Sequence, residues 1–222
     1  MAFVLPRPRS RTRTAILSLL AGLVMIFVAD VARKAIGEAF VNADFPEALA
    51  VKLERLPLIF PLHMLAGGLA LLLLPAVIAA RRWPAWHRRL GRIAAVDVSI
   101  AGVTALPVAW VSPVSPWSGA GFGLQALVWM SFLTLGIWHI RHRRRVQHRA
   151  AMLLMTATAS GAIFFRLYLA TWAVFGEPRD FVLVYSIDAW VAWLGPLAAM
   201  AWRLKREQKG FAAARQSAIS AP

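Results

Sequence analysis

The chain has 222 residues, of which 59% are hydrophobic and 16% charged, with a formal net charge of +15 and no cysteine. Soluble domains are about 45–50% apolar, and this chain repeatedly carries uncharged apolar runs long enough to cross a bilayer. Its composition therefore excludes a large soluble domain and predicts an integral membrane protein of the helical class. The lack of cysteine excludes disulfides, thiolate metal sites and cysteine nucleophiles.

The N-terminal quarter predicts a basic cytoplasmic segment, a first span and an external loop. Residues 1–14 are basic, and the apolar run 15–29 follows them. Because no convincing small-x-small cleavage site precedes Asp30, we interpret this pair as an uncleaved signal anchor. The rest of the region 15–56 has mixed charge and is predicted to be an external loop that contains a short surface helix.

Five further apolar runs predict five more membrane spans, at 57–80, 90–111, 119–140, 150–175 and 181–202. The linkers between them are a basic stretch, a Pro/Ser/Gly-rich turn, a second basic stretch and a tight turn, at 81–92, 111–121, 141–149 and 176–180. We therefore predict an all-α integral membrane bundle of about six helices. Its parts are a four-helix core at 57–175, a sixth span at 176–204 and a cytoplasmic tail at 205–222.

The distribution of Lys and Arg predicts which side of the membrane each linker faces. Of the 25 Lys and Arg residues, 19 fall in the N-terminal segment, the two basic linkers and the tail, and five fall in the other connections. The positive-inside rule places the richer set, and with it both termini, in the cytoplasm. Tryptophans near the predicted span ends agree with this, because indole rings favour the interface: Trp83, Trp86, Trp117, Trp138 and Trp202. In a soluble protein this charge would suggest nucleic-acid binding, but its position between spans predicts no nucleic-acid partner.

Ionisable side chains inside the predicted spans are candidate functional groups, because burying them in lipid is costly. His63, Gln125, Arg166 and Asp188 all lie about 9–13 Å from the outer ends of their spans, at about 1.5 Å per residue. They could share one layer, either as an Arg166–Asp188 ion pair that braces two helices or as a site for an anionic or quinone-like group. Asp97 lies toward the cytoplasmic side and is expected to pair with a nearby arginine such as Arg89 or Arg92, with a proton relay as the alternative.

Histidines at the cytoplasmic edge are either solvated surface residues or haem ligands: His87, His139, His142 and His148. A b-type haem needs an axial imidazole from each of two facing helices, with small side chains beside its ring. The helix face that begins at His87 is mostly Gly and Ala, whereas the face that begins at His148 carries Met152 and Met155 before two alanines and Arg166. Small residues also serve close helix packing without a cofactor, so both interpretations remain.

Three motifs resemble a family of bacterial multi-pass membrane proteins, the domain-of-unknown-function family 2306. They are "LHMLAGGLALLLLP", "HRRLGR" and "HRAAML", the last opening a span that carries "FRLY", and the resemblance covers about 57–175. It implies the following family-type positions: His63, His87, Gly91, Arg92, His148, Met152 and Arg166. One departure is visible, because the family often has a basic residue soon after the methionine and this chain reads "MLLMTATAS".

A more distant resemblance is to the six-span, two-haem transmembrane cytochromes b that accept electrons from ascorbate. It implies that His87 and His148 ligate the iron of one haem b on the cytoplasmic side, and that His63 sits where one ligand of an outer haem could be. The fourth span offers Gln125 and Met130, but no histidine, as the outer partner. We therefore expect one haem at most, and no electron path across the membrane.

Three hypotheses for function remain from the sequence. The first is a redox protein with haem b on His87 and His148 and a quinone or acidic ligand near His63 and Arg166. The second is a small-molecule transporter or binding protein that uses the layer of His63, Arg166 and Asp188, and the third is a non-catalytic accessory subunit. The chain has no phosphate-binding Gly-Lys loop and no His-Glu-x-x-His motif, and we identify no catalytic residue. We expect it in the bacterial inner membrane, with lipid and a quinone or membrane redox protein as partners, and its oligomeric state is left open.

Overall fold

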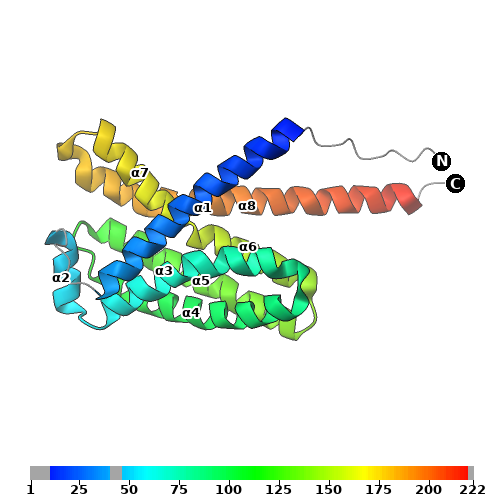
Figure 1. Ribbon diagram of the computed structural model, residues 1–222, viewed down its shortest axis with the longest axis horizontal. Helices are drawn as coiled ribbons and strands as arrows, with labels where there is room; N and C mark the ends of the chain where they lie inside the picture. Colours follow the sequence, from blue (N-terminus) through cyan, green and yellow to red (C-terminus); the bar gives the residue numbers. More distant parts are fainter. Residues whose placement is uncertain (1–10, 41–46, 220–222) are drawn as a thin grey trace.

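The computed structural model describes residues 11–40 and 47–219, and within them every regular element is a helix (Figure 1). The α-helices are α1 (Arg11–Phe40), α2 (Glu47–Arg55), α3 (Ile59–Ala79), α4 (Pro84–Trp110), α5 (Pro116–Arg141), α6 (Arg145–Ala159), α7 (Gly161–Phe175) and α8 (Phe181–Ile219). Two short 3₁₀ turns, η1 (Ala80–Arg82) and η2 (Pro178–Asp180), precede α4 and α8. The described residues confirm the predicted all-α class.

Five segments of the described chain are long and apolar enough to cross a membrane, and they extend over 59–82, 84–110, 116–141, 145–175 and 178–210. The helix α1 lies outside this set, and its assignment as a span rests on the apolar run 15–29. Large apolar side chains point outward along these segments, as expected for helices that face lipid; examples are Leu72, Val96, Val103, Leu127, Leu135 and Val191. The protein is thus a multi-pass membrane bundle of about six spans.

The core lies between α3, α4, α5 and α6. Small and apolar side chains from all four helices form one buried cluster: Ala66, Ala70 and Leu74 of α3, Val98 and Ala101 of α4, Trp129 and Leu133 of α5, and Met155 and Ala159 of α6. Small residues let membrane helices approach closely, so van der Waals contact can hold them together where lipid provides no hydrophobic drive. These four helices, all within 57–175, thus share one buried cluster.

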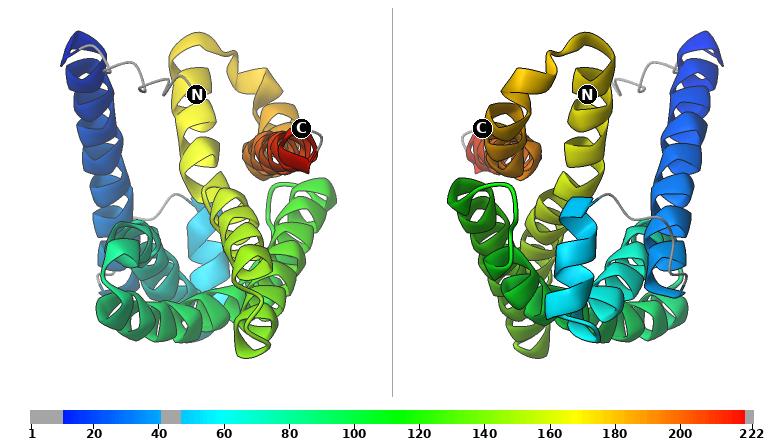
Figure 2. Two further views of the ribbon diagram at one scale, coloured as in Figure 1. Left: turned by 90° about the vertical axis from the view of Figure 1, so that its right-hand side faces the viewer. Right: turned by 90° about the vertical axis from the view of Figure 1, so that its left-hand side faces the viewer.

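The remaining long helices pack on the outside of this core. The helix α1 lies against α3, where Val28, Val31 and Ala32 pack with Leu71, and α8 lies along α5, α6 and α7. In the end-on views, α1 and α7 both extend away from the four-helix core (Figure 2). The core is therefore covered unevenly by its neighbours.

The turns of the bundle alternate between two ends, as the charge distribution predicted. The α3–α4 and α5–α6 turns lie at the end toward which α1 begins and α8 finishes, on the right in Figure 1. The α4–α5 and α7–α8 turns lie at the opposite end, together with α2. We refer to these as the inner end and the outer end, because the basic linkers occupy the first. Residues 1–10 of the predicted basic N-terminus lie outside the described residues.

Several helices extend beyond the predicted spans. The basic stretch 81–92 is not a linker throughout: α4 begins at Pro84, and proline suits a first helical position because its missing N–H would have no partner there. His87 therefore belongs to the first turn of a helix. At the other end, α5 begins at Pro116 behind Ser115, whose hydroxyl accepts a hydrogen bond from the Ser118 N–H in an N-cap.

The fifth predicted span is two helices rather than one. The helix α6 ends at Ala159 and α7 begins at Gly161, with Ser160 between them. The prolines at 75, 107 and 196 lie inside continuous helices. The break between α6 and α7 falls at Ser160 and Gly161, two small residues. In the predicted tail at 205–222, α8 continues as far as Ile219.

Candidate functional site

Two histidines at the inner end hold the ends of neighbouring helices through their Nδ1 atoms. His87 Nδ1 lies 3.0 Å from the Val77 carbonyl of α3, and His148 Nδ1 lies 2.8 Å from the Gly136 carbonyl of α5. A carbonyl oxygen only accepts hydrogen bonds, so in both rings Nδ1 must carry the proton. In the neutral imidazole that tautomer leaves the Nε2 lone pair available to a metal or a proton donor.

The surroundings of these two imidazoles differ. No atom lies within 4 Å of the position that a Cβ on Gly91, one turn after His87, would take. Beside His148 the space is filled, because the Met152 side chain lies where a Cβ on Gly136 would be. A side chain would therefore find room at Gly91, one turn from His87, but not at Gly136, whose carbonyl holds His148.

The structure connects the two histidines through α5 rather than by direct contact. Both α4 and α6 pack against α5, and no hydrogen bond joins His87 to His148 among the described residues. Within the same residues no group of three or more His, Asp or Glu side chains gathers as metal ligands. The two imidazoles thus lie on helices that both pack against α5, and a main-chain carbonyl holds the Nδ1 of each.

His63 lies at the outer end of the bundle, and its hydrogen bonds are separate from those of His87 and His148. Its Nδ1 lies 3.1 Å from the Ala101 carbonyl and 3.3 Å from the Thr104 hydroxyl of α4, while that hydroxyl donates to the Ile100 carbonyl at 2.7 Å. Ala101 lies 14 residues after His87 along α4, or about 21 Å at 1.5 Å per residue. His63 and His87 therefore tie α3 to α4 at opposite ends and do not form one site.

The predicted outer layer is present in part, without the hydrogen-bonded ion pair that was one alternative. Both carboxylate oxygens of Asp188 are buried and have no hydrogen-bond partner among the described residues. Arg166 donates to the Ala162 carbonyl at 2.9 Å, and Gln125 donates to the Thr158 carbonyl at 3.0 Å. Tyr185 of α8 packs its ring edge-on against Phe165, the residue before Arg166, with the ring centroids 5.1 Å apart. This layer thus holds a buried carboxyl group on the helix that carries Tyr185.

Sequence reasoning missed Lys52 and Tyr185 as members of the outer layer. Lys52 is 7% exposed although it lies on the short helix α2, and burial lowers the pKa of its ammonium group. The helix α2 packs against α3, the helix that carries His63. The apolar stretch around Tyr185 and the polar stretch around Lys52 carry no local signal that would have placed either residue there.

Asp97 does not have the arginine partner that the sequence suggested. Its Oδ2 atom is buried without a hydrogen-bond partner in the part of the chain that the structure describes, where the ion pairs involve Asp30 and Glu207 instead. Asp97 lines a shallow hollow of about 430 Å³ on α4 together with Arg92, Ile93, Val96 and Ile100. An Asp97 pair with Arg89 or Arg92 is therefore not formed.

The remaining histidines of the inner end have separate environments. His142 is exposed, and its Nδ1 bonds to the Trp138 carbonyl of its own helix at 2.8 Å. The Nδ1 atom of His139 is buried and has no partner among the described residues. His142 is thus a solvated surface residue, whereas His139 lies in the wall of the bundle.

Comparison with known proteins identifies the family. A family model described as predicted membrane protein (DUF2306) matches residues 60–203, from α3 into α8. The chain belongs to this family. The match extends beyond the motifs at 57–175 and covers the spans that carry His63, His87, His148, Arg166 and Asp188.

No curated protein and no solved structure matches the chain. The comparisons therefore support the membrane family and no particular activity. The more distant resemblance to two-haem cytochromes b finds no support in them.

Proposed function

We propose that this DUF2306 protein binds one haem b at its inner end, with the imidazoles of His87 and His148 as axial ligands. The observation that supports the proposal is the Nδ1–H bond that each ring makes to a main-chain carbonyl. Ligating histidines almost always make such a bond, which fixes the tautomer, orients the ring and raises the basicity of the ligating nitrogen. Gly91 leaves open space one turn from His87.

The protein's own groups would hold the cofactor and set its surroundings. When neutral, each ring that donates its Nδ1–H to the Val77 or Gly136 carbonyl presents its Nε2 lone pair to a metal. The basic linkers at the inner end surround the site with positive charge. A bound haem supplies one-electron redox chemistry. One haem at one end offers no path across the membrane, so its electron partner would be a quinone or a membrane redox protein on the same side.

The outer layer is a separate prediction. That His63 and Arg166 bind a cofactor or an anionic ligand stays a prediction, and so does the alternative that the layer serves a small-molecule transporter or binding protein. A non-catalytic accessory subunit would use the same contacts only to hold helices together. None of these alternatives predicts a coloured protein, so an absorption spectrum distinguishes the proposed haem from all of them.

The test is a visible absorption spectrum of the detergent-purified protein, expressed with ample haem supply, before and after dithionite. We expect a Soret band and a sharpened reduced α-band. His87→Asn and His148→Asn should each abolish or shift these bands, because an amide N–H can still reach the carbonyl but cannot replace the imidazole as an iron ligand. His142→Asn is the matched control and should leave the spectrum unchanged.

Two results would overturn the proposal. One is a colourless wild-type protein that is monodisperse and helical by circular dichroism. The other is a spectrum that neither His87→Asn nor His148→Asn changes, since the pigment would then be held by other groups.

A further inference from the structure

A groove of about 320 Å³ lies between α5, α6 and α8 at the inner end. Its walls are mainly apolar and include Phe132, Leu135, Val146, Ala150 and Leu154. From Val146 to Leu154 it follows eight residues of α6, or about 12 Å, which is most of the roughly 15 Å that one leaflet contributes to the hydrocarbon core. The groove thus has the length and polarity of a seat for a lipid acyl chain.

Polar groups gather beside this groove. Gln147 and Gln208 line it, and so does His139, whose Nδ1 is buried without a hydrogen-bond partner among the described residues. Arg149 and Glu207 each directly precede a lining residue, Ala150 and Gln208 respectively. The groove therefore combines apolar walls with hydrogen-bonding side chains and adjacent charges.

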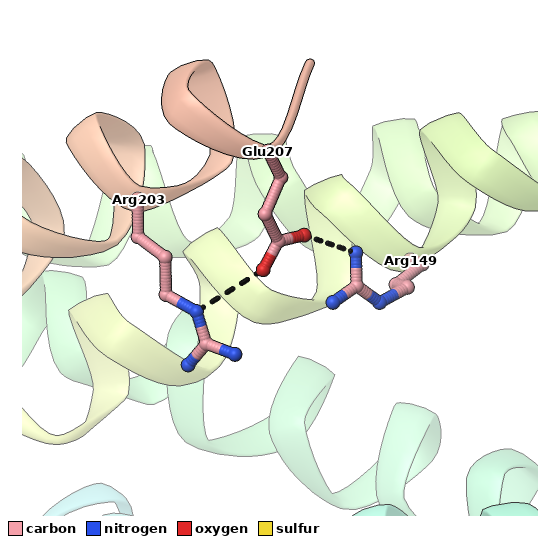
Figure 3. A network of polar contacts seen from close by, with 3 residues as sticks. All are labelled: Arg149, Arg203 and Glu207. Carbon is pink, nitrogen blue, oxygen red and sulfur yellow. Dashed lines mark hydrogen bonds and ion pairs between the residues drawn. The ribbon is translucent and has the colours of Figure 1, made fainter. Parts of the chain in front are cut away.

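One carboxylate holds two arginines next to the groove. Glu207 of α8 accepts from Arg149 Nη1 of α6 at 2.9 Å and from Arg203 Nε of its own helix at 3.2 Å (Figure 3). The three side chains keep a net charge of +1, and each guanidinium retains N–H donors that no described residue uses. Because guanidinium groups present donors in a rigid fork that matches phosphate oxygens, the pair is pre-organised for a phosphate.

Tryptophans place this arginine pair at the level of lipid headgroups. The described cation–π contacts all lie at the inner end, with guanidinium carbons 4.6–5.8 Å from the ring centroids: Arg82 with Trp83, Arg89 with Trp86, Arg144 with Trp138, and Arg206 with Trp202. Trp is enriched at the membrane interface, and the cytoplasmic leaflet carries anionic lipids that attract basic segments. The phosphate level of that leaflet therefore coincides with Arg149 and Arg203.

We propose that this groove is a specific binding site for an anionic phospholipid. One acyl chain lies between α5, α6 and α8, and the phosphate binds the free guanidinium donors of Arg149 and Arg203. The Nδ1 of His139 supplies a further polar group in the groove wall. The site requires neither haem nor any residue assigned to it, so it stands apart from the proposed function.

The experiment measures binding of dioctanoyl-phosphatidylglycerol to the full chain in a neutral detergent by native mass spectrometry. Dioctanoyl-phosphatidylcholine tests the charge, and glycerol 3-phosphate tests whether a headgroup suffices without chains. A basic residue near an anionic lipid contributes about 1 kcal/mol, or about fivefold in affinity. We expect phosphatidylglycerol to bind at least about fivefold more tightly than phosphatidylcholine, and glycerol 3-phosphate not to bind measurably.

Variants separate a specific site from general attraction to the basic end. Arg203→Gln should weaken phosphatidylglycerol binding by about fivefold, whereas Arg88→Gln removes an exposed charge on α4 at the same end and should have little effect. Val146→Trp should obstruct the groove and weaken both lipids, and because Val146 is 73% exposed the fold should tolerate the change.

Three results would overturn the proposal. Equal affinity for phosphatidylglycerol and phosphatidylcholine would remove the role of charge. Equal losses in Arg203→Gln and Arg88→Gln would indicate unspecific attraction. Binding of glycerol 3-phosphate as tight as that of the lipid would indicate a simple anion site without an acyl-chain groove.

Discussion

At the scale of single residues, Gly161 lies where the bundle has no room for a side chain. A Cβ there would lie 2.6 Å from Gln125 Nε2 and 2.7 Å from the Trp193 Cβ. Trp193 is almost fully buried, so it has little freedom to move away. The absence of a side chain at Gly161 is therefore what lets α8 close against the break between α6 and α7.

We expect Gly161→Ala to destabilise the protein by about 1–3 kcal/mol, the usual cost of overpacking a well-packed core. Thermal unfolding in detergent measures the loss as a lower Tm. Gly195→Ala is the control on α8, because nothing lies within 4 Å of the Cβ that it would add. Equal Tm values for the two variants would show that the contact at Gly161 relaxes without cost.

The polar residues inside the spans were recognisable from sequence, but their partners were not. His63 stood out because polarity is rare inside an apolar span, whereas His87 and His148 stood out as histidines within the basic stretches at the cytoplasmic edge. Their hydrogen-bond acceptors are main-chain carbonyls, such as those of Val77 and Gly136. Since every residue carries a carbonyl, no pattern of side chains marks the ones that accept.

At the scale of elements, the core is made of two helical hairpins with matching polar contacts. In α3–α4, His63 reaches the Ala101 carbonyl at the outer end and His87 holds α3 at the inner end. In α5–α6, Gln125 reaches the Thr158 carbonyl at the outer end and His148 holds α5 at the inner end. Each hairpin thus has one hydrogen bond from a side chain to a main-chain carbonyl near each end. At the outer end the donor is His63 in the first hairpin and Gln125 in the second.

Removing the outer contact of the second hairpin should loosen α6 where it breaks into α7. We expect Gln125→Leu to cost about 0.5–2 kcal/mol, because the Thr158 carbonyl lies two residues before Ser160 and would lose its side-chain donor. Thermal unfolding in detergent measures this cost. Ser131→Ala is the control, since that exposed hydroxyl bonds only to Leu127 of its own helix, and a Tm as low as that of Gln125→Leu would contradict the prediction.

At the scale of the whole molecule, the alternation of basic and non-basic turns orients the bundle in the membrane. The basic turns lie together at the inner end and the others at the outer end. Because the chain has no native cysteine, single cysteines can report this orientation without background.

A membrane-impermeant maleimide applied to intact cells should label Pro113→Cys and Glu177→Cys, which replace exposed residues of the outer turns. Arg145→Cys, at the exposed start of α6, should react only after the membrane is permeabilised. The reverse pattern would invert the orientation, and labelling of all three in intact cells would contradict the membrane-spanning arrangement.

The sequence by itself determined the class of protein and the approximate spans, and it predicted their orientation. Each depends on a local property: the transfer free energy of an apolar run, or the number of Lys and Arg beside it. Only the tertiary structure decided the contacts of His87, His148 and Asp188, the break at Ser160 and the groove beside Arg149. These depend on which backbone groups and side chains of distant helices meet, and the packing of small residues that brings them together has no signal within any single span.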